Sequence, residues 1–275
     1  GRRRAYDIFF KTVVYLSAFL TVALLVVLIG YIFVRGLPHI TGQLLSTAPS
    51  VLKDTIGILP NILNTLYIIL FTLLIALPLG VGAAVYLTEY ASNKTFIRIV
   101  EFATETLAGI PSIIYGLVGM LVLVPGIRKI FNVPDGASLL AAIIVLAIMI
   151  LPSIIKVSVT ALEAVPGEYE DASLALGATP EETWFRVSVP AAKSGIAGRA
   201  IGEAMAVMMV SGNVPNMPEL FQSVRFLTTA VASEMSYSSG LQRQALFSIA
   251  LVLFLFIMLI NAALNFFLKR DKEGN

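Results

Sequence analysis

The sequence predicts an all-α membrane protein with six transmembrane helices. Hydrophobic residues make up 57% of its 275 residues and charged residues 13%, whereas a soluble domain carries about 25% charged residues. The mean hydropathy is +0.88. A membrane-spanning helix needs roughly 20 consecutive apolar residues, and the sequence offers six such runs. We expect these helices near residues 12–34, 61–88, 99–124, 138–157, 190–211 and 244–268.

Composition also argues against several functions. The formal net charge of +2 is too small to suggest a nucleic-acid partner, and the absence of cysteine excludes disulfides and thiolate metal sites. The single histidine, His39, lies in a Gly-Leu-Pro-His loop, where we expect neither a metal ligand nor a catalytic base. No nucleophile–base pair is evident in the sequence. We therefore expect neither enzyme activity nor a metal site.

The first run is read as a membrane anchor. It is longer than the apolar region of a signal peptide and has no small-x-small cleavage site after it. We expect residues 1–11 to form a cytoplasmic N-terminal segment, residues 12–268 the transmembrane domain, and residues 269–275 a cytoplasmic tail.

The second and third runs contain Pro78 and Pro111, which membrane helices tolerate better than soluble ones do. Pro111 should free the carbonyl near position 107, and Ser112 could satisfy a backbone group. A simple kink and a hinge or pore constriction both fit this pattern. Glu105, near the start of the third run, is expected to reach the interface or to pair with Arg98 or Lys94.

The fifth run contains two charged residues, Arg199 and Glu203, four residues apart and therefore on one helix face. If the helix enters the membrane near Pro190, Arg199 lies about 13 Å deeper at ~1.5 Å per residue. A charge at mid-depth costs at least ~2.5 kcal/mol, so it must be paired or face water. Two interpretations stay open: an ion pair that only holds the bundle together, or a cation that lines the path of an anion and is oriented by Glu203.

Orientation follows from the basic residues, which are retained on the cytoplasmic side of a membrane. They are more frequent in the two terminal segments and in the inner loops, 158–189 among them, than in the outer loops 35–60, 125–137 and 212–243. Both termini and the loop 158–189 are therefore expected in the cytoplasm. The longest outer loop carries Asn213, and loops of that length are uncommon without a role.

A polar segment, residues 163–190, separates the fourth and fifth runs. Pro166 and Gly167 precede a predicted short helix over Glu168–Leu176, and Gly177 is a natural helix stop. Acidic residues occupy its first turn, where the helix dipole favours them. Three apolar residues share one face at helical spacing, namely Ala172, Ala175 and Leu176. A second helix should open with Pro180, Glu181 and Glu182.

The order Asp171-Ala172-Ser173, Gly177 and Val187-x-Val189-Pro190 resembles the EAA loop of ATP-binding-cassette importer permeases. That pattern is Glu-Ala-Ala, three residues, Gly, nine residues and aliphatic-x-aliphatic-Pro. Asp171 stands for Glu and Ser173 for Ala. The alternative is an ordinary surface hairpin. The resemblance implies a type I ABC importer permease fold with a cytoplasmic EAA coupling helix. It implies contact with an ATPase through Glu170, Asp171, Ala172, Ser173, Ala175, Leu176 and Gly177.

Further segments resemble the phosphate-importer permeases of the PstC and PstA types, which pair as a heterodimer. The similar segments are 72–90, 107–116 and 199–203. The segments 204–207 and 211–213 look more like PstC, whereas the short length and the segment 86–90 look more like PstA. We favour the PstC type.

The resemblance implies a permease for inorganic phosphate that forms half of a translocation path in the plasma (inner) membrane. Its implied partners are a second permease subunit, two ABC ATPase subunits and an extracytoplasmic phosphate-binding protein. The sequence lacks G-x-x-x-x-G-K-[ST], so we expect no cofactor on this chain, with ATP and Mg²⁺ on the ATPase subunits. The residues expected along the substrate path are Arg199, Glu203, Ser112, Tyr115 and Asn213.

Two other functions stay open. The chain could be an ABC permease for another oxyanion, such as molybdate or sulfate. It could also be an ion-gradient-driven secondary carrier with Glu105 or Glu203 as its proton site, although that function leaves the pattern in 163–190 unexplained.

Overall fold

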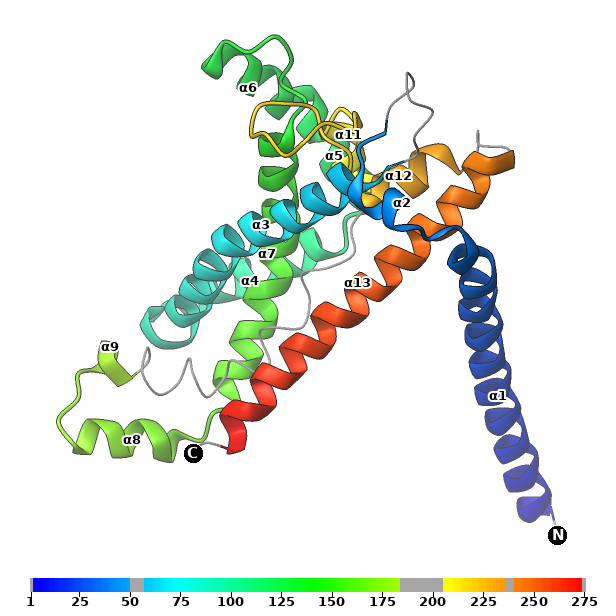
Figure 1. The fold of residues 1–275 in the computed structure, drawn as a ribbon. Coiled ribbons are helices and arrows are strands. Elements are labelled where there is room, and N and C mark those ends of the chain that lie inside the picture. Colours follow the sequence, from blue (N-terminus) through cyan, green and yellow to red (C-terminus); the bar gives the residue numbers. More distant parts are fainter. Residues whose placement is uncertain (1, 50–56, 184–204, 236–239, 274–275) are drawn as a thin grey trace.

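The computed structural model describes residues 2–49, 57–183, 205–235 and 240–273. Within these ranges the regular elements are helices, and the only β feature is an isolated bridge between Gly212 and Val224 (Figure 1). Five segments in these ranges are long and apolar enough to cross a membrane: Tyr6–His39, Leu59–Tyr90, Ser112–Phe131, Leu139–Glu163 and Arg243–Ile260. The all-helical membrane fold is therefore confirmed.

The first helix, α1 (Arg2–Gly36), stands apart from the rest of the molecule along most of its length (Figure 1). It begins before the predicted residue 12 because its polar start is also helical, with Asp7 and Lys11 forming an i,i+4 ion pair at 3.1 Å. Only its final turns pack on α13 (Gly240–Glu273), where the Ser248 hydroxyl donates to the Gly36 carbonyl at 2.9 Å. The short helices η1 (Leu37–His39) and α2 (Gly42–Ser46) follow.

The centre of the bundle is the packing of α3 (Leu59–Val85) on α7 (Leu139–Glu163). A Cβ atom on Gly80 of α3 would lie 2.5 Å from Cγ2 of Ile154 on α7, so this close approach requires glycine. The main apolar core surrounds α7. Pro78 lies inside α3, as the sequence predicts, and a π-helical turn, η2 (Tyr86–Tyr90), ends this segment.

The third predicted helix, 99–124, is wrong in its bounds. The structure has α4 (Lys94–Ala108), a break at Gly109–Pro111, and then α5 (Ser112–Val118), the π turn η3 (Gly119–Leu123) and α6 (Val124–Phe131). Pro111 has no N–H for the preceding turn and becomes the N-cap of α5, so the chain breaks instead of kinking. The membrane-length segment is Ser112–Phe131, and it extends into the predicted outer loop 125–137.

The fifth predicted helix, 190–211, lies largely outside the described residues. Its last part is seen as α11 (Met205–Val210), which packs against α5 and α7. The helix α12 (Leu227–Glu234) follows, and α13 extends beyond both ends of the predicted helix 244–268.

Figure 1 shows how the ends of the bundle are arranged. Both termini lie at the same end as the helices α8 (Gly167–Ala175) and α9 (Pro180–Thr183). The helices α2, α6, α11 and α12 lie at the opposite end. The termini and the described part of the loop 158–189 thus lie at one end of the bundle, and the side of the membrane on which they lie stays a prediction.

Candidate functional site

The helices α8 and α9 form a short hairpin at the end of the bundle that carries both termini. The predicted helix Glu168–Leu176 is confirmed to within one residue, because α8 spans Gly167–Ala175. Gly177 has φ +89°, as expected for a helix stop that only glycine adopts without strain. The N–H of Ala178 then donates to the Ser173 carbonyl at 3.3 Å, which closes the end of α8.

The hairpin is held together before any partner binds. Thr179 and Glu182 form a reciprocal capping box, in which the Glu182 N–H donates to Thr179 Oγ1 at 3.2 Å and the Thr179 N–H donates to the Glu182 carboxylate at 3.3 Å. The hydroxyls of Ser173 and Thr183 share a hydrogen bond of 2.9 Å between the two helices. Thr183 is 1% exposed. Sequence reasoning treated Ser173 only as a replacement for Ala and missed this bond.

The apolar edge of α8 faces away from the described part of the chain. Ala172 and Ala175 are exposed, and Leu176 is 90% exposed. Asp171, at the start of the motif, is also exposed, and Glu170 lies in the same helix. An exposed apolar edge on a pre-formed element is typical of a binding surface.

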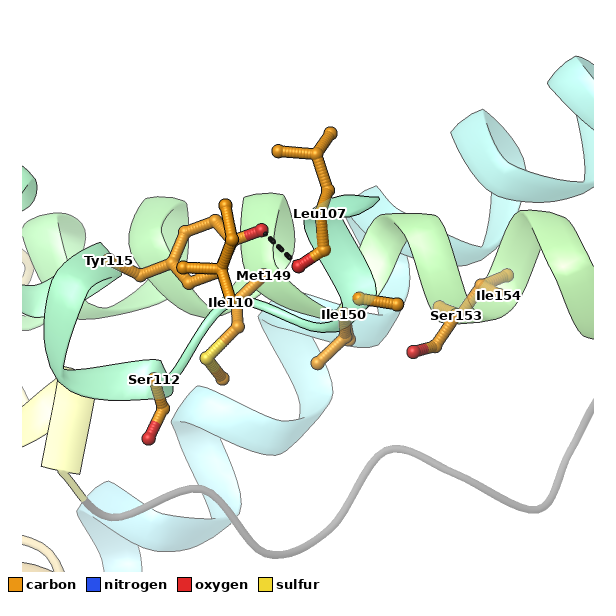
Figure 2. A pocket seen from close by; sticks show the side chains of 9 residues that line it. Leu107, Ile110, Ser112, Tyr115, Met149, Ile150, Ser153 and Ile154 are labelled. Atoms are coloured by element: carbon orange, nitrogen blue, oxygen red, sulfur yellow. Dashed lines mark hydrogen bonds between the residues drawn. The ribbon is translucent and has the colours of Figure 1, made fainter. Parts of the chain in front are cut away.

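A second part of the candidate site is a cavity of about 130 Å³ beside the break between α4 and α5 (Figure 2). It lies opposite the middle of α7. The polar side chains that line it are Ser112 and Tyr115 from α5 and Ser153 from α7. The other lining residues are Leu107, Ala108, Ile110, Met149, Ile150 and Ile154. The structure thus brings two predicted path residues together and adds Ser153, which sequence reasoning missed.

The Tyr115 side chain bridges the break between α4 and α5. Its hydroxyl donates to the Leu107 carbonyl at 2.9 Å, shown as the dashed line in Figure 2. This is the carbonyl that Pro111 was predicted to free. At this carbonyl the donors are the Tyr115 hydroxyl and the Ile110 N–H, and not Ser112.

Below this cavity, Glu105 of α4 forms an ion pair with Lys156 of α7 at 2.8 Å. The expected partners Arg98 and Lys94 are therefore wrong, because α4 turns its charged face toward α7. Glu105 lies outside the five candidate spans. The hydrogen bond from Lys156, and then its positive charge, lower the pKa of the Glu105 carboxyl.

Of the remaining predicted path residues, Asn213 is described and does not line this cavity. Asn213 lies in the loop after α11, with φ 53°, and its carbonyl accepts from Arg225 Nε at 3.1 Å. The Arg225 guanidinium also pairs with Glu234 of α12. Arg199 and Glu203 lie outside the described residues.

The sequence matches the family described as "Binding-protein-dependent transport system inner membrane component" over residues 76–270. The chain belongs to this family. It is a membrane-embedded component of a transport system and not a catalytic subunit, and its function in such a system implies partner proteins.

Individual relatives agree with the family. The chain is 39% identical over 218 residues to "Probable ABC transporter permease protein YqgH" of Bacillus subtilis, covering 74% of this chain and 70% of the relative. It is 35% identical over 251 residues to "Phosphate transport system permease protein PstC" of Pasteurella multocida, covering 81% and 78%. Among solved structures, the MetNI methionine ABC transporter in an inward-facing conformation matches with a TM-score of 0.57. That match is 22% identical over 78% of this chain and 94% of the other, and it shows the fold alone.

Proposed function

We propose that this chain is the permease subunit of an ABC importer for inorganic phosphate, in which it forms half of the translocation path. The observation that carries the proposal is the pre-formed α8–α9 hairpin with its exposed Leu176 edge. In this position the hairpin would receive force from a separate ATPase and pass it to α7. The names of the PstC relatives support phosphate as the substrate.

The proposed assembly contains a second permease subunit, two ABC ATPase subunits and an extracytoplasmic phosphate-binding protein. We place the chain in the inner membrane with both termini and the hairpin in the cytoplasm, where ATP is available. ATP and Mg²⁺ would bind to the ATPase subunits, and this chain would bind no cofactor. High-affinity selection would belong to the binding protein, because tight binding within the membrane would trap the anion.

The cavity in Figure 2 supports weak binding of an anion along the path. Ser112 and Ser153 offer hydroxyl donors from opposite walls, and their neutral groups would stabilise a passing oxyanion without holding it. We place Arg199 as the cation of the path and Glu203 as the group that orients it. The guanidinium of Arg199 could donate two parallel hydrogen bonds to a phosphate.

A proton-driven carrier is less well supported. A proton site in such a carrier needs a carboxyl that titrates near neutral pH, whereas the ion pair with Lys156 lowers the pKa of Glu105. Glu203, the other candidate, lies outside the described residues, and a carrier would leave the pattern in 163–190 without a role. A different oxyanion is the more serious alternative, since molybdate and sulfate would also meet hydroxyl donors and an arginine favourably.

The test is anion uptake by vesicles that contain the complete reconstituted transporter with its binding protein. We expect phosphate uptake that requires ATP, persists after an uncoupler is added, and is not reduced by excess sulfate or molybdate. Uptake that collapses with the uncoupler would support the carrier instead. Equal competition by sulfate or molybdate would show that the transporter is not specific for phosphate.

A further inference from the structure

The charged residues of α4 form a single stripe. Lys94, Arg98, Glu101 and Glu105 are spaced by four, three and four residues, so they share one helix face. Three of them line a cavity of about 430 Å³ between α4 and α7. The opposite wall of this cavity carries Lys156, Thr160 and Glu163, which share one face of α7 in the same way.

The two stripes are arranged so that opposite charges face each other. The helices are antiparallel, because Leu107 and Ala108 of α4 line the smaller cavity with residues 149–154 of α7, whereas the earlier α4 residues, 98–105, line the larger cavity with the later α7 residues, 155–163. Glu105 meets Lys156 at 2.8 Å. Arg98 lies about two turns from Glu105, and Glu163 lies about two turns from Lys156, both toward the hairpin end of the bundle. In this register Arg98 faces Glu163.

In this structure that second pair is not made. Among the described residues, Arg98 and Glu163 form no ion pair, and both are exposed on the walls of the same cavity. The interface between α4 and α7 is therefore closed at Glu105–Lys156 and open at its hairpin end.

The neighbouring structure allows α4 to close on α7. The break at Gly109–Pro111 separates α4 from α5, and the cavity of about 130 Å³ leaves room at this joint. The Tyr115–Leu107 hydrogen bond bridges the break. Glu163 is the last residue of α7 and lies just before α8, which starts at Gly167. Only Ala164, Val165 and Pro166 separate Glu163 from α8, so a movement of α8 would act on Glu163 through a short link.

We propose that Arg98 and Glu163 are an inner latch, an ion pair that forms in one state of the transport cycle and closes the cavity between α4 and α7. The structure holds the open state of this latch. Water-exposed ion pairs contribute little net free energy, so little free energy is needed to make or break the pair. The latch rests on the proposed function, because it requires an ATPase to move the hairpin.

Cysteine cross-linking tests the latch directly, because the chain has no cysteine of its own. The complete transporter in vesicles would carry the pair Arg98→Cys and Glu163→Cys, with the pair Glu105→Cys and Lys156→Cys as a matched control. A short bifunctional thiol reagent is added without nucleotide and again with ATP and vanadate. We expect the control pair to cross-link in both states. The latch pair should cross-link at least about fivefold more in one state than in the other.

Two outcomes would overturn the latch: equal cross-linking of the 98–163 pair in both states, or no cross-linking of this pair in either state while the control pair reacts. Charge exchange gives a second readout. Arg98→Glu alone should reduce ATP-dependent uptake about tenfold, and adding Glu163→Arg should restore most of it. Failure of this rescue while the exchanged protein assembles would also overturn the latch. If the proposed function itself is wrong, the unmodified transporter will show no ATP-dependent uptake, which distinguishes that failure from a failure of the latch alone.

Discussion

At the scale of single residues, Tyr115 shows how one side chain can hold a broken helix. A proline at position 111 removes the donor that the Leu107 carbonyl would have in a continuous helix. The Tyr115 hydroxyl provides a replacement at 2.9 Å. Its ring also lines the cavity beside α7. The residue was predicted for the substrate path, and the structure shows a structural role for it beside the cavity.

Tyr115→Phe should therefore loosen the joint without emptying the cavity wall. The ring stays, and one hydrogen bond is lost, which should lower the free energy of unfolding by about 1 kcal/mol. Thermal unfolding of the purified protein in detergent measures this change. Tyr15→Phe is the control, because Tyr15 is 74% exposed on α1. Equal melting temperatures for the two variants would contradict the role of Tyr115.

Arg199 and Glu203 carry the prediction on anion handling. Arg199→Gln alone should abolish import, because it leaves Glu203 as an unpaired charge that costs several kcal/mol unless it protonates. The double change Arg199→Gln with Glu203→Gln should restore assembly and leave transport inactive. Both are measured by co-purification with the partner subunits and by vesicle uptake. Normal phosphate uptake by the assembled double variant would show that the pair is only structural.

At the scale of elements, the α8–α9 hairpin is built by local chemistry that the sequence largely predicts. The helix stop at Gly177 and the start of α9 at Pro180 follow from residue preferences near each end. The hydrogen bond between Ser173 and Thr183 could not be predicted, because it depends on how tightly the chain turns between the two helices.

Ser173→Ala tests this bond. The change should leave Thr183 as a buried hydroxyl without its partner and reduce local stability by about 1 kcal/mol. Hydrogen exchange of the backbone amides in 178–183 should then accelerate about fivefold, in line with that free energy. Thr183→Val should have a similar effect, and the double variant should be no worse than either single one. Strictly additive effects would argue against the bond.

The separation of α4 from α5 could not be predicted from hydropathy. The prediction treated 99–124 as one helix because it relied on apolar content. Hydropathy does not show toward which neighbour a helix face points. Pro111 explains the break, and the charged stripe of α4 faces α7 and its Lys156. The partner of Glu105 lies on another helix, so no spacing rule within α4 could have found it.

At the scale of the whole molecule, the two ends of the bundle are different. The hairpin and both termini lie at one end, and α11, α12 and the loop between them lie at the other (Figure 1). The loop is tied to α3, because Asn64 donates to the carbonyls of Asn216 at 2.8 Å and Arg225 at 3.2 Å. Five of the six predicted spans have a counterpart among the described residues, the third of them shifted to Ser112–Phe131, whereas this tie required the folded structure.

Reporter fusions test the orientation of the molecule. A reporter placed after Lys272 should be active in the cytoplasm, and one inserted near Asn216 should be active outside, because basic residues concentrate at the hairpin end. Enzyme reporters that are active on only one side of the membrane make this measurement. The opposite result at either position would place the hairpin on the side without ATP and contradict the proposed coupling.

The most direct test of the central claim measures ATP hydrolysis and phosphate uptake together in vesicles that hold the complete transporter with Gly177→Asp. At φ +89° any side chain is strained by roughly 1–2 kcal/mol. No heavy atom lies within 4 Å of an added Cβ there, so strain and not collision is the cause. Gly167→Ala is the control, because Gly167 has equal space and no positive φ. The account predicts an assembled Gly177→Asp transporter that no longer couples hydrolysis to uptake, and a control that imports normally. Import at the normal rate by Gly177→Asp, with unchanged stimulation of hydrolysis, would contradict it.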